Sequence, residues 1–534
     1  MTTERKRRGL NPLKVVFALE YVLQGLASPF LGITYQPFFK HLRSLGLDEA
    51  AVQSLYGTSF LAWGFKPAIG FVMDAYGKTR TVLIVLLALA AAGFLLTPLV
   101  AGGARSFFWV VFAISVVLSA TDVAVDRATV IVGAEEATAD GRSRSTAVGL
   151  NQAICWLALY GTLIGSAIAG GYVADHVPFK GLLVGLALVP LIVLAAVLRL
   201  PRDRAVTIPL RRSIAAFWRG LNTGPVLGVV VFYFVFFFQP AVGTIWTEHL
   251  LRDLGFSQTQ AGIGDGAGYF GYFVGVLLFA WKGVKWQERL GLRKLFAILI
   301  VVSAVLSMAK YLLLDPTFSA MTGRLHAALP FLDRGTVRLG FLCACNVVMA
   351  LGDSLVRMST FSVAGAVIPV AAAGSLFAGM MSVNNLAYAA SYNSGAWLYA
   401  HGMEVGIVRS AQAALFGIGG GAGQPLSMQM LILVGSAAFL VSFALLPVLP
   451  DRRATLAKTV DEPGAAGPDA ALPPRLRVAV DAGAVALGVA VLLLATLRWD
   501  IGAISAVLMS FFGVTVIRRL VVVGLARTVV EKAR

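Results

Sequence analysis

Two pairs of charged residues lie inside apolar runs of this sequence, where a charge is costly. Asp122 and Asp126 are four residues apart, and so are Asp353 and Arg357, so each pair shares one face of a helix. An ionisable side chain at the centre of a bilayer costs about 2.5–3.5 kcal/mol on insertion scales, so each should face a partner or a water-filled cavity. Two aspartates on one face repel when both are ionised, which favours the uptake of a proton and suits a proton carrier.

The same residues also fit a structural role. Arg127 and Arg357 could complete an ion-pair network that pins two halves of the protein together, and this role is compatible with proton transfer. Glu20 and Gln24 also lie four residues apart in an apolar run, which makes Glu20 the second candidate for a proton site.

Further polar and aromatic side chains in apolar runs could line a cavity. They are Asn151, Gln152 and Trp156 in one run and Asn384, Asn385, Tyr388, Tyr392 and Asn393 in another. Such a set could stack against a planar ring and form hydrogen bonds to it. Aromatic side chains in membrane helices also pack against neighbours or mark the membrane interface, and the interfacial interpretation is the one we expect for Lys310 and Tyr311.

An acid and two bases end the second long apolar run. Asp74, Lys78 and Arg80 would lie in a tight loop after this run, Gly70 lets another helix pack closely, and Gly77 permits the turn. The pattern resembles the loop between helices 2 and 3 of major facilitator transporters, in which the acid helps to hold the two halves together on the cytoplasmic side. The alternative is an ordinary cytoplasmic loop.

Composition indicates a polytopic membrane protein. Of the 534 residues, 58% are hydrophobic and only 13% are charged, and the mean hydropathy of +0.80 exceeds that of soluble chains. The net charge of +17 is spread over short segments between apolar runs, which argues against a nucleic-acid partner. We expect no enzyme activity, cofactor, metal site or disulfide, because no catalytic set or metal-ligand spacing occurs and the three cysteines fall within apolar runs.

Apolar runs of about 20 residues predict the membrane helices. They lie near residues 13–39, 50–73, 81–102, 106–132, 143–172, 179–199, 224–250, 260–282, 293–313, 337–363, 370–400 and 427–449, with two more near 478–497 and 501–525. Basic loops recur on one side of these helices, and the positive-inside rule assigns that side to the cytoplasm. Both termini are therefore expected in the cytoplasm, and the expected location is a bacterial inner or plasma membrane.

The first twelve of these runs contain an internal repeat. Val15–Phe17 is followed by Gln24, and Val230–Phe232 is followed at the same spacing by Gln239. The seventh predicted helix, over 224–250, therefore resembles the first, over 13–39. Similar short sequence matches follow in the same order in both parts of the chain, which predicts two six-helix halves related by a repeat.

The repeat has a consequence for charge and for domain boundaries. It places Asp126 of one half opposite Arg357 of the other, so we expect these two side chains to pair across a cavity. The predicted domains are a helical bundle over residues 1–200, a cytoplasmic linker over 201–223, a second bundle over 224–450, a linker over 451–477 and a two-helix membrane tail over 478–534.

Four stretches carry a more specific resemblance. They are Trp63-xx-Lys66-Pro67-xx-Gly70-xxx-Asp74, then Asp122–Asp126, then Leu150–Trp156 with Gly161, Gly165 and Gly170-Gly171, and finally Ser382–Asn385. Over roughly residues 13–450 the chain resembles the folate and biopterin transporter family of the major facilitator superfamily. The resemblance implies an all-α, twelve-helix fold with a central cavity and the uptake of folates or pterins, commonly coupled to protons. It also implies that Lys66, Gly70 and Asp74 gate the path, and that Asp122, Asp126 and Asn384 line or control it.

Three departures from the family pattern bear on the solute. Met73 precedes the gate acid, Arg127 follows Asp126, and no arginine follows Glu135–Glu136. Related muropeptide and acetyl-coenzyme A permeases carry a similar Asp-xxx-Asp helix. We therefore expect a monomeric secondary transporter in the lipid bilayer that carries a folate- or pterin-like solute together with protons. The alternatives are a transporter of another organic anion, muropeptide or nucleotide-linked, and a non-transporting membrane assembly factor.

Overall fold

A computed structural model of the chain describes residues 12–140, 144–201, 207–221, 224–240, 243–314, 316–328, 333–367 and 373–449, with isolated positions beyond 450. All regular elements in these residues are helices, which confirms the all-α fold class. The expected linker over 451–477 and the expected tail helices lie outside the described residues, apart from the isolated positions.

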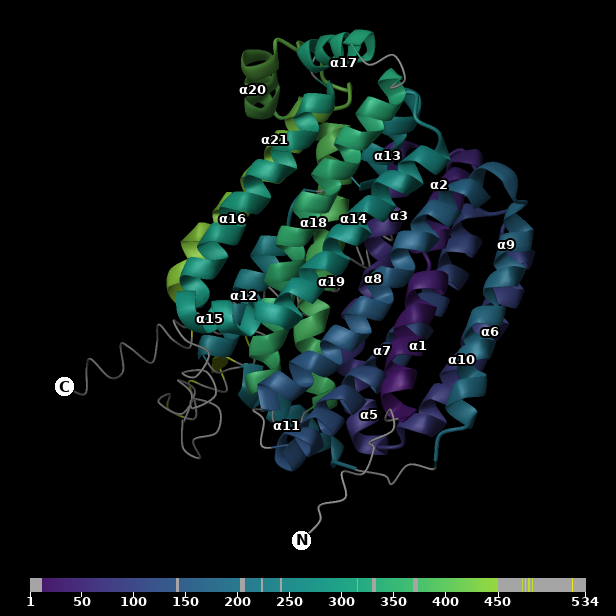
Figure 1. The fold of residues 1–534 in the computed structure, drawn as a ribbon, viewed down its shortest axis with the longest axis vertical. Coiled ribbons are helices and arrows are strands. Elements are labelled where there is room, and N and C mark those ends of the chain that lie inside the picture. The colour runs from purple at the N-terminus through teal and green to yellow at the C-terminus, as the bar shows by residue number, and fades with distance from the viewer. Residues whose placement is uncertain are drawn as a thin grey trace, which may run out of the picture.

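The first part of the chain crosses the bundle repeatedly (Figure 1). Its elements are α1 (Pro12–Ala27), η1 (Gly32–Thr34), α2 (Tyr35–Ser44), α3 (Glu49–Ser59), α4 (Leu61–Gly64), α5 (Lys66–Tyr76), α6 (Thr79–Val100), α7 (Ala104–Asp140), α8 (Arg144–His176), α9 (Phe179–Leu186) and α10 (Leu188–Leu198). The amphipathic helix α11 (Leu210–Leu221) follows at one end of the bundle.

The second part runs beside the first. Its elements are α12 (Gly224–Phe237), α13 (Gly243–Arg252), α14 (Gln258–Leu278), the π-helical turn η2 (Phe279–Gly283), α15 (Val284–Leu290), α16 (Leu292–Met308), η3 (Ala309–Leu314), α17 (Pro316–Ala328), α18 (Arg334–Val367), α19 (Ala373–His401), η5 (Gly402–Glu404), α20 (Gly406–Phe416), α21 (Met428–Val441) and η6 (Ser442–Val448). Helices α17 and α20 lie at the end of the bundle opposite to α5 and α11 (Figure 1).

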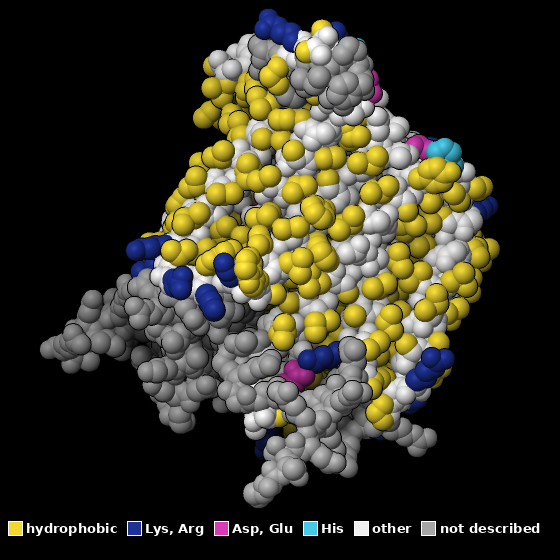
Figure 2. Space-filling model, in the orientation of Figure 1, with side chains coloured by type: hydrophobic (Ala, Val, Ile, Leu, Met, Phe, Trp, Pro, Cys, Tyr) yellow, Lys and Arg dark blue, Asp and Glu magenta, His cyan; other side chains and the backbone are white. Residues whose placement is uncertain are grey.

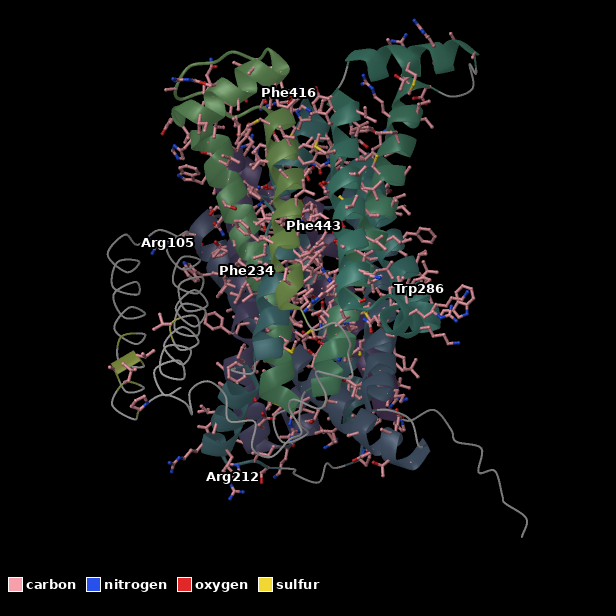
Figure 3. The ribbon with its side chains drawn as sticks, turned by 90° about the vertical axis from the view of Figure 1, so that its left-hand side faces the viewer. Arg105, Arg212, Phe234, Trp286, Phe416 and Phe443 are labelled. Atoms are coloured by element: carbon pink, nitrogen blue, oxygen red, sulfur yellow. The ribbon has the colours of Figure 1, made fainter. Side chains whose placement is uncertain are left out.

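The outer surface of the bundle matches a membrane environment. Nine helical segments within the described residues are long and apolar enough to cross a bilayer. In Figure 2, hydrophobic side chains cover the middle of the visible face, whereas lysine and arginine side chains gather toward its two ends. Figure 3 shows Arg212 of α11 pointing away from one such end, and Trp286 of α15 pointing away from the side of the bundle.

Several helices that the sequence predicts as continuous are divided: the predicted helix over 50–73 is α3, α4 and α5, and that over 179–199 is α9 and α10. Two others have wider breaks. The first predicted helix, over 13–39, is interrupted after Ala27, where Phe30 and Gly32 have φ angles of 62° and 55°. The predicted helix over 224–250 ends at Phe237 and resumes at Gly243. Pro29 and Pro240 explain both breaks, because proline lacks the amide hydrogen and clashes with the preceding helical turn. Broken helices of this kind leave backbone groups facing a central cavity in many transporters.

Helix α8 approaches α14 closely through small residues. A Cβ atom at Gly171 would overlap the carbonyl oxygen of Gln258, and one at Gly262 would meet the carbonyl oxygen of Ala167. These contacts join the two parts of the chain, and glycine is required here because the backbones themselves touch.

The substitution Gly171→Ala should therefore destabilise the protein, because a methyl group forced into a packed contact costs about 1–3 kcal/mol. Gly165→Ala is the matched control, since it lies on the same helix and a Cβ there meets nothing within 4 Å. Alanine is the better helix former, so this control should be neutral or slightly stabilising. Thermal unfolding in detergent would separate the two variants, and equal melting temperatures would contradict the proposed contact.

Candidate functional site

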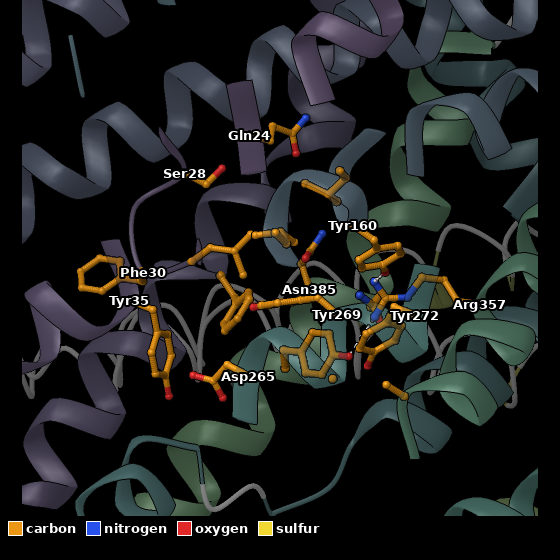
Figure 4. Close-up of a pocket in the computed structure, with 18 of the residues that line it drawn as sticks. Gln24, Ser28, Phe30, Tyr35, Tyr160, Asp265, Tyr269, Tyr272, Arg357 and Asn385 are labelled. Atoms are coloured by element: carbon orange, nitrogen blue, oxygen red, sulfur yellow. Dashed lines mark hydrogen bonds between the residues drawn. The ribbon is translucent and has the colours of Figure 1, made fainter. Parts of the chain in front are cut away.

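A cavity of about 380 Å³ lies in the middle of the bundle, between the two parts of the chain. Its walls combine charged side chains, such as Lys66 and Arg357, with aromatic ones, such as Tyr272 and Tyr388. Figure 4 shows Tyr35 and Asp265 on one side of this cavity and Arg357 on the other, with Tyr269 and Tyr272 between them. Several elements supply these residues, so only the tertiary fold brings them together.

A buried ion cluster forms one wall of the cavity. The ammonium group of Lys66 on α5 forms an ion pair with Asp122 on α7, and its Nζ lies 3.6 Å from Oδ2 of Asp126. The three residues are at most 4% exposed. Asp126 also accepts hydrogen bonds from the hydroxyl group of Tyr21, at 2.9 Å, and from Nε2 of Gln152, at 3.1 Å.

A third carboxylate lies behind this cluster. Glu20 on α1 accepts hydrogen bonds from Nε2 of Gln24, at 2.8 and 3.0 Å, and from the hydroxyl group of Thr121, at 2.9 Å. Glu20 and Gln24 therefore share a helix face as their spacing predicts, and Gln24 also lines the cavity. Asp122 and Asp126 thus share one lysine, and Glu20 forms no ion pair with the described residues. The negative charge of the three carboxylates therefore exceeds the positive charge of Lys66 unless protons or a cation compensate.

Arg357 lies at the opposite wall in an aromatic cage. Its Nη1 donates to the hydroxyl oxygen of Tyr160, at 2.8 Å, and its Nη2 to that of Tyr388, at 2.9 Å. The guanidinium carbon lies 5.2 Å from the ring centre of Trp156 and 5.4 Å from that of Tyr272. The residue is only 7% exposed, and its Nε has no hydrogen-bond partner among the described residues. No carboxylate of the described residues lies within ion-pair distance of this cation.

The expected ion pair between Asp126 and Arg357 is not formed in this structure. Asp126 is held by Lys66, Tyr21 and Gln152. Trp156 stands between the two charges, because its indole N–H donates to Gln152 at 3.2 Å while its ring packs against Arg357. The repeat placed both residues on the cavity wall, as observed, but it could not show which neighbours would satisfy each charge.

Asp74 connects several elements at the end of the bundle that carries α5 and α11, which we call the Asp74 end. Its Oδ1 lies 3.3 Å from Nε of Arg127, and its Oδ2 accepts from the hydroxyl group of Ser213, at 2.8 Å, and from the amide of Ser375, at 3.1 Å. Ser213 belongs to α11 and Ser375 to α19. The carboxylate therefore ties α5 and α7 to elements from the second part of the chain and the connection before it.

Three of the residues predicted to form the gate contact other partners than the expected ones. Lys66 lies eight residues before Asp74, or about 12 Å along a helix, so it contacts the cavity aspartates instead of the Asp74 end. Arg80 donates to the carbonyl oxygen of Leu198, at 2.9 Å, and Lys78 lies 5.9 Å from the ring centre of Tyr76. Arg127, which comes from another helix, forms an ion pair with Asp74. Gly70 is buried within α5.

The opposite end, which we call the Glu49 end, is bridged by a second group of charges. Nη2 of Arg43 lies 3.1 Å from Glu49 and 3.2 Å from Glu248, and Nη1 of Arg252 lies 3.3 Å from Glu49. Nearby, Gln53 accepts hydrogen bonds from α13. Contacts between the two parts of the chain therefore bridge both ends of the cavity.

The other predicted site residues divide into two groups. Cavity-lining residues are Trp156, Asn384, Asn385 and Tyr388. Asn151, Gln152, Gln239, Asp353 and Arg127 lie outside the set that lines the cavity. Asp353 contacts Ser303 and Tyr272, and the backbone amide of Gln239 donates to Ser391 beside the break in the helix. Oδ1 of Asn384 is buried without a hydrogen-bond partner among the described residues.

Sequence reasoning missed part of the cavity wall. Tyr21, Tyr160, Asp265 and Tyr272 line it, and so does Lys310, which we expected at the membrane interface. The prediction for Lys310 was wrong because the 3₁₀ helix η3 continues α16 and directs this side chain inward toward Trp246, whose ring centre lies 5.7 Å from Nζ. The available signal was an acid, Asp265, inside the apolar run of α14.

Comparison with known proteins places this geometry in context. Residues 24–471 match the BT1 family, whereas no curated protein matches the sequence. A mutant of the nucleoside transporter NupG has a TM-score of 0.55 at 14% identity, over 82% of this chain and 99% of that chain. A D-xylose-proton symporter has a TM-score of 0.55 at 15% identity, over 82% and 98%. The major facilitator proton:xylose symporter XylE has a TM-score of 0.50 at 12% identity, over 83% and 96%.

The match to the family covers most of the sequence, and the structural similarity covers most of the fold. The helices that are long and apolar enough to span a bilayer agree with both. The chain is therefore a multi-pass membrane protein that belongs to the BT1 family and has the major facilitator fold.

Proposed function

We propose that the chain is a proton-coupled secondary transporter that carries a folate- or pterin-like organic anion by alternating access. The observation that supports this function most directly is Arg357, a buried cation in the cavity wall that has no carboxylate partner within ion-pair distance among the described residues. A buried charge without a counter-ion is costly. A carboxylate or phosphate group on the solute would supply that counter-ion.

The aromatic cage suits the same solute. Tyr160 and Tyr272 stack with their ring centres 4.9 Å apart, and together with Trp156 they surround the guanidinium group. These rings fix the direction of the cation and offer apolar faces to a planar ring system. An aromatic organic anion therefore fits this wall better than a neutral sugar.

The cluster of Lys66, Asp122 and Asp126 is the proposed proton site. A proton on either aspartate would release Lys66 from one partner and change the contacts between α5 and α7. Glu20, which contacts Thr121 beside Asp122, is the next carboxylate in line. This arrangement couples the charge state of the cavity wall to the position of α5, whose far end carries Asp74.

Alternating access requires that the two ends of the cavity open in turn. We take residues 1–200 and 224–450 as two moving bundles and the side of Asp74, with both termini, as cytoplasmic. The contacts of Asp74 with α11 and α19 would then hold the cytoplasmic side shut. The contacts of Glu49 and Arg43 with α13 would hold the outer side.

The test is binding and uptake by the purified protein. Folates and pterins should raise the melting temperature more than muropeptides, nucleotides or sugars, since a ligand that binds only the folded state stabilises it. In proteoliposomes, an inward proton gradient should accelerate their uptake. Arg357→Gln should abolish binding of the anions, whereas Arg409→Gln, at an exposed position on α20, should not. Stabilisation by none of these solutes would contradict the proposal and favour an assembly role.

A further inference from the structure

A second group of polar side chains lines the same central cavity, in its part toward the Glu49 end. Asp265 on α14, Lys310 on η3 and Asn346 on α18 line it. Building on the proposed function, we propose that Asp265 recognises the 2-amino-4-oxo-pyrimidine edge of a fused ring, as in a pterin, while Arg357 binds the acidic group at the other end of the same solute.

The carboxylate of Asp265 has a free acceptor. Its Oδ2 accepts one hydrogen bond, from Nε2 of Gln36 at 3.2 Å, and no described residue donates to Oδ1 or forms an ion pair with the group. A 2-amino-4-oxo-pyrimidine presents two parallel N–H groups, from the amino substituent and the adjacent ring nitrogen. Two parallel donors match the two oxygens of a carboxylate in the same way as a guanidinium group does.

The neighbours of Asp265 complement the rest of that edge. The ammonium group of Lys310 forms no hydrogen bond or ion pair with the described residues and lies 5.7 Å from the ring centre of Trp246, so it can donate to the 4-oxo group. Oδ1 of Asn346 is buried and has no hydrogen-bond partner among the described residues, although Nδ2 donates to the carbonyl oxygen of Gly264 at 2.9 Å. A buried acceptor without a donor is costly, and the second N–H of the 2-amino group would satisfy it.

The spacing along α14 sets the length of the solute. Asp265 and Tyr272 are seven residues apart on this helix, which corresponds to about 10 Å, and the ring of Tyr272 lies 5.4 Å from the guanidinium carbon of Arg357. Tyr269 lies between Asp265 and Arg357 (Figure 4) and can pack against the ring system of the solute. A ring at Asp265 and an acid at Arg357 thus require an elongated molecule, which excludes a small carboxylate.

The test compares ligands that differ only in the amino group. Pterin-6-carboxylate carries the 2-amino group, and lumazine-6-carboxylate has an oxygen in its place. Full-length wild-type protein in lipid nanodiscs should bind the pterin at least about tenfold more tightly, because a site built for hydrogen bonding rejects an analogue that leaves its polar groups unpaired. The pair of guanosine 5′-monophosphate and inosine 5′-monophosphate tests the same edge on a purine and shows whether a guanine nucleotide uses the pocket instead.

Asp265→Asn should remove the preference for the 2-amino compound and leave binding of the lumazine within about twofold. Asp333→Asn, an exposed substitution at the start of α18, is the matched control and should keep the preference. Equal affinity of wild-type protein for pterin and lumazine would overturn the assignment of Asp265, and that measurement needs no variant. An equal loss of both ligands in Asp265→Asn would also overturn it, whereas binding of neither ligand to wild-type protein would overturn the proposed function itself.

Discussion

Replacement of Lys66 by methionine is expected to cost about 3–5 kcal/mol of folding stability, because two buried aspartates lose the cation that they share. The side chain is 4% exposed and contacts both Asp122 and Asp126, so its loss leaves both carboxylates poorly solvated and without this cation. Uptake should be lost as well if the cluster carries the transported proton. Thermal unfolding and proton-driven uptake measure the two effects.

The double variant Lys66→Met with Asp122→Asn should be more stable than Lys66→Met alone, since it removes a charge that would otherwise remain without its partner. A double-mutant cycle gives the coupling free energy between the two residues directly. Lys282→Met is the control, because Lys282 is exposed and lies over the ring of Trp281. A coupling energy near zero would show that the pair contributes nothing to stability.

Asp74→Asn should loosen the Asp74 end and lower uptake severely. The carboxylate accepts from Arg127, Ser213 and the amide of Ser375, and a hydrogen bond to a charged group contributes about 1.5–3 kcal/mol. Loss of one such contact would shift an equilibrium between closed and open forms by about 10- to 150-fold. Amide hydrogen exchange should therefore rise near Ser213 in α11 and near Ser375 in α19.

The variant Asp253→Asn provides the control for this experiment, because Asp253 forms exposed contacts with His249 and Arg252 at the other end of the bundle. In Asp253→Asn, amide hydrogen exchange near Ser213 and Ser375 should be the same as in the wild-type protein. If Asp74→Asn also leaves exchange and uptake at the wild-type level, then Asp74 does not hold this end closed.

Much of the architecture follows from local features of the sequence. The lengths of the apolar runs predicted the helices, because a segment that crosses a bilayer must be apolar over about 20 residues. The predicted helix over 81–102 corresponds to α6, Thr79–Val100. Gly77 ends α5 with a φ of 72°, as its place in the turn predicted, because glycine adopts this conformation without a steric penalty.

The sequence predicted only part of the candidate site. Asp122, Asp126 and Arg357 stood out in the sequence because charges are rare in apolar helices, and the structure places all three on the cavity wall. The helix breaks at Ser28–Leu31 and Phe238–Pro240 were missed, although Pro29 and Pro240 marked them. The hydrophobic pattern continues across both prolines, so run length alone predicted unbroken helices.

Partners across helices were decided by the tertiary structure. Tyr21 contacts Asp126 over a separation of 105 residues, and Arg357 contacts Tyr160 over 197. The sequence by itself determined that the chain forms apolar helices and that several of them carry charges that need partners. Only the packed fold decided that Lys66 pairs with the aspartates, that Arg127 binds Asp74 and that Lys310 faces the cavity, because the tilt and rotation of each helix are set by its contacts with all the others.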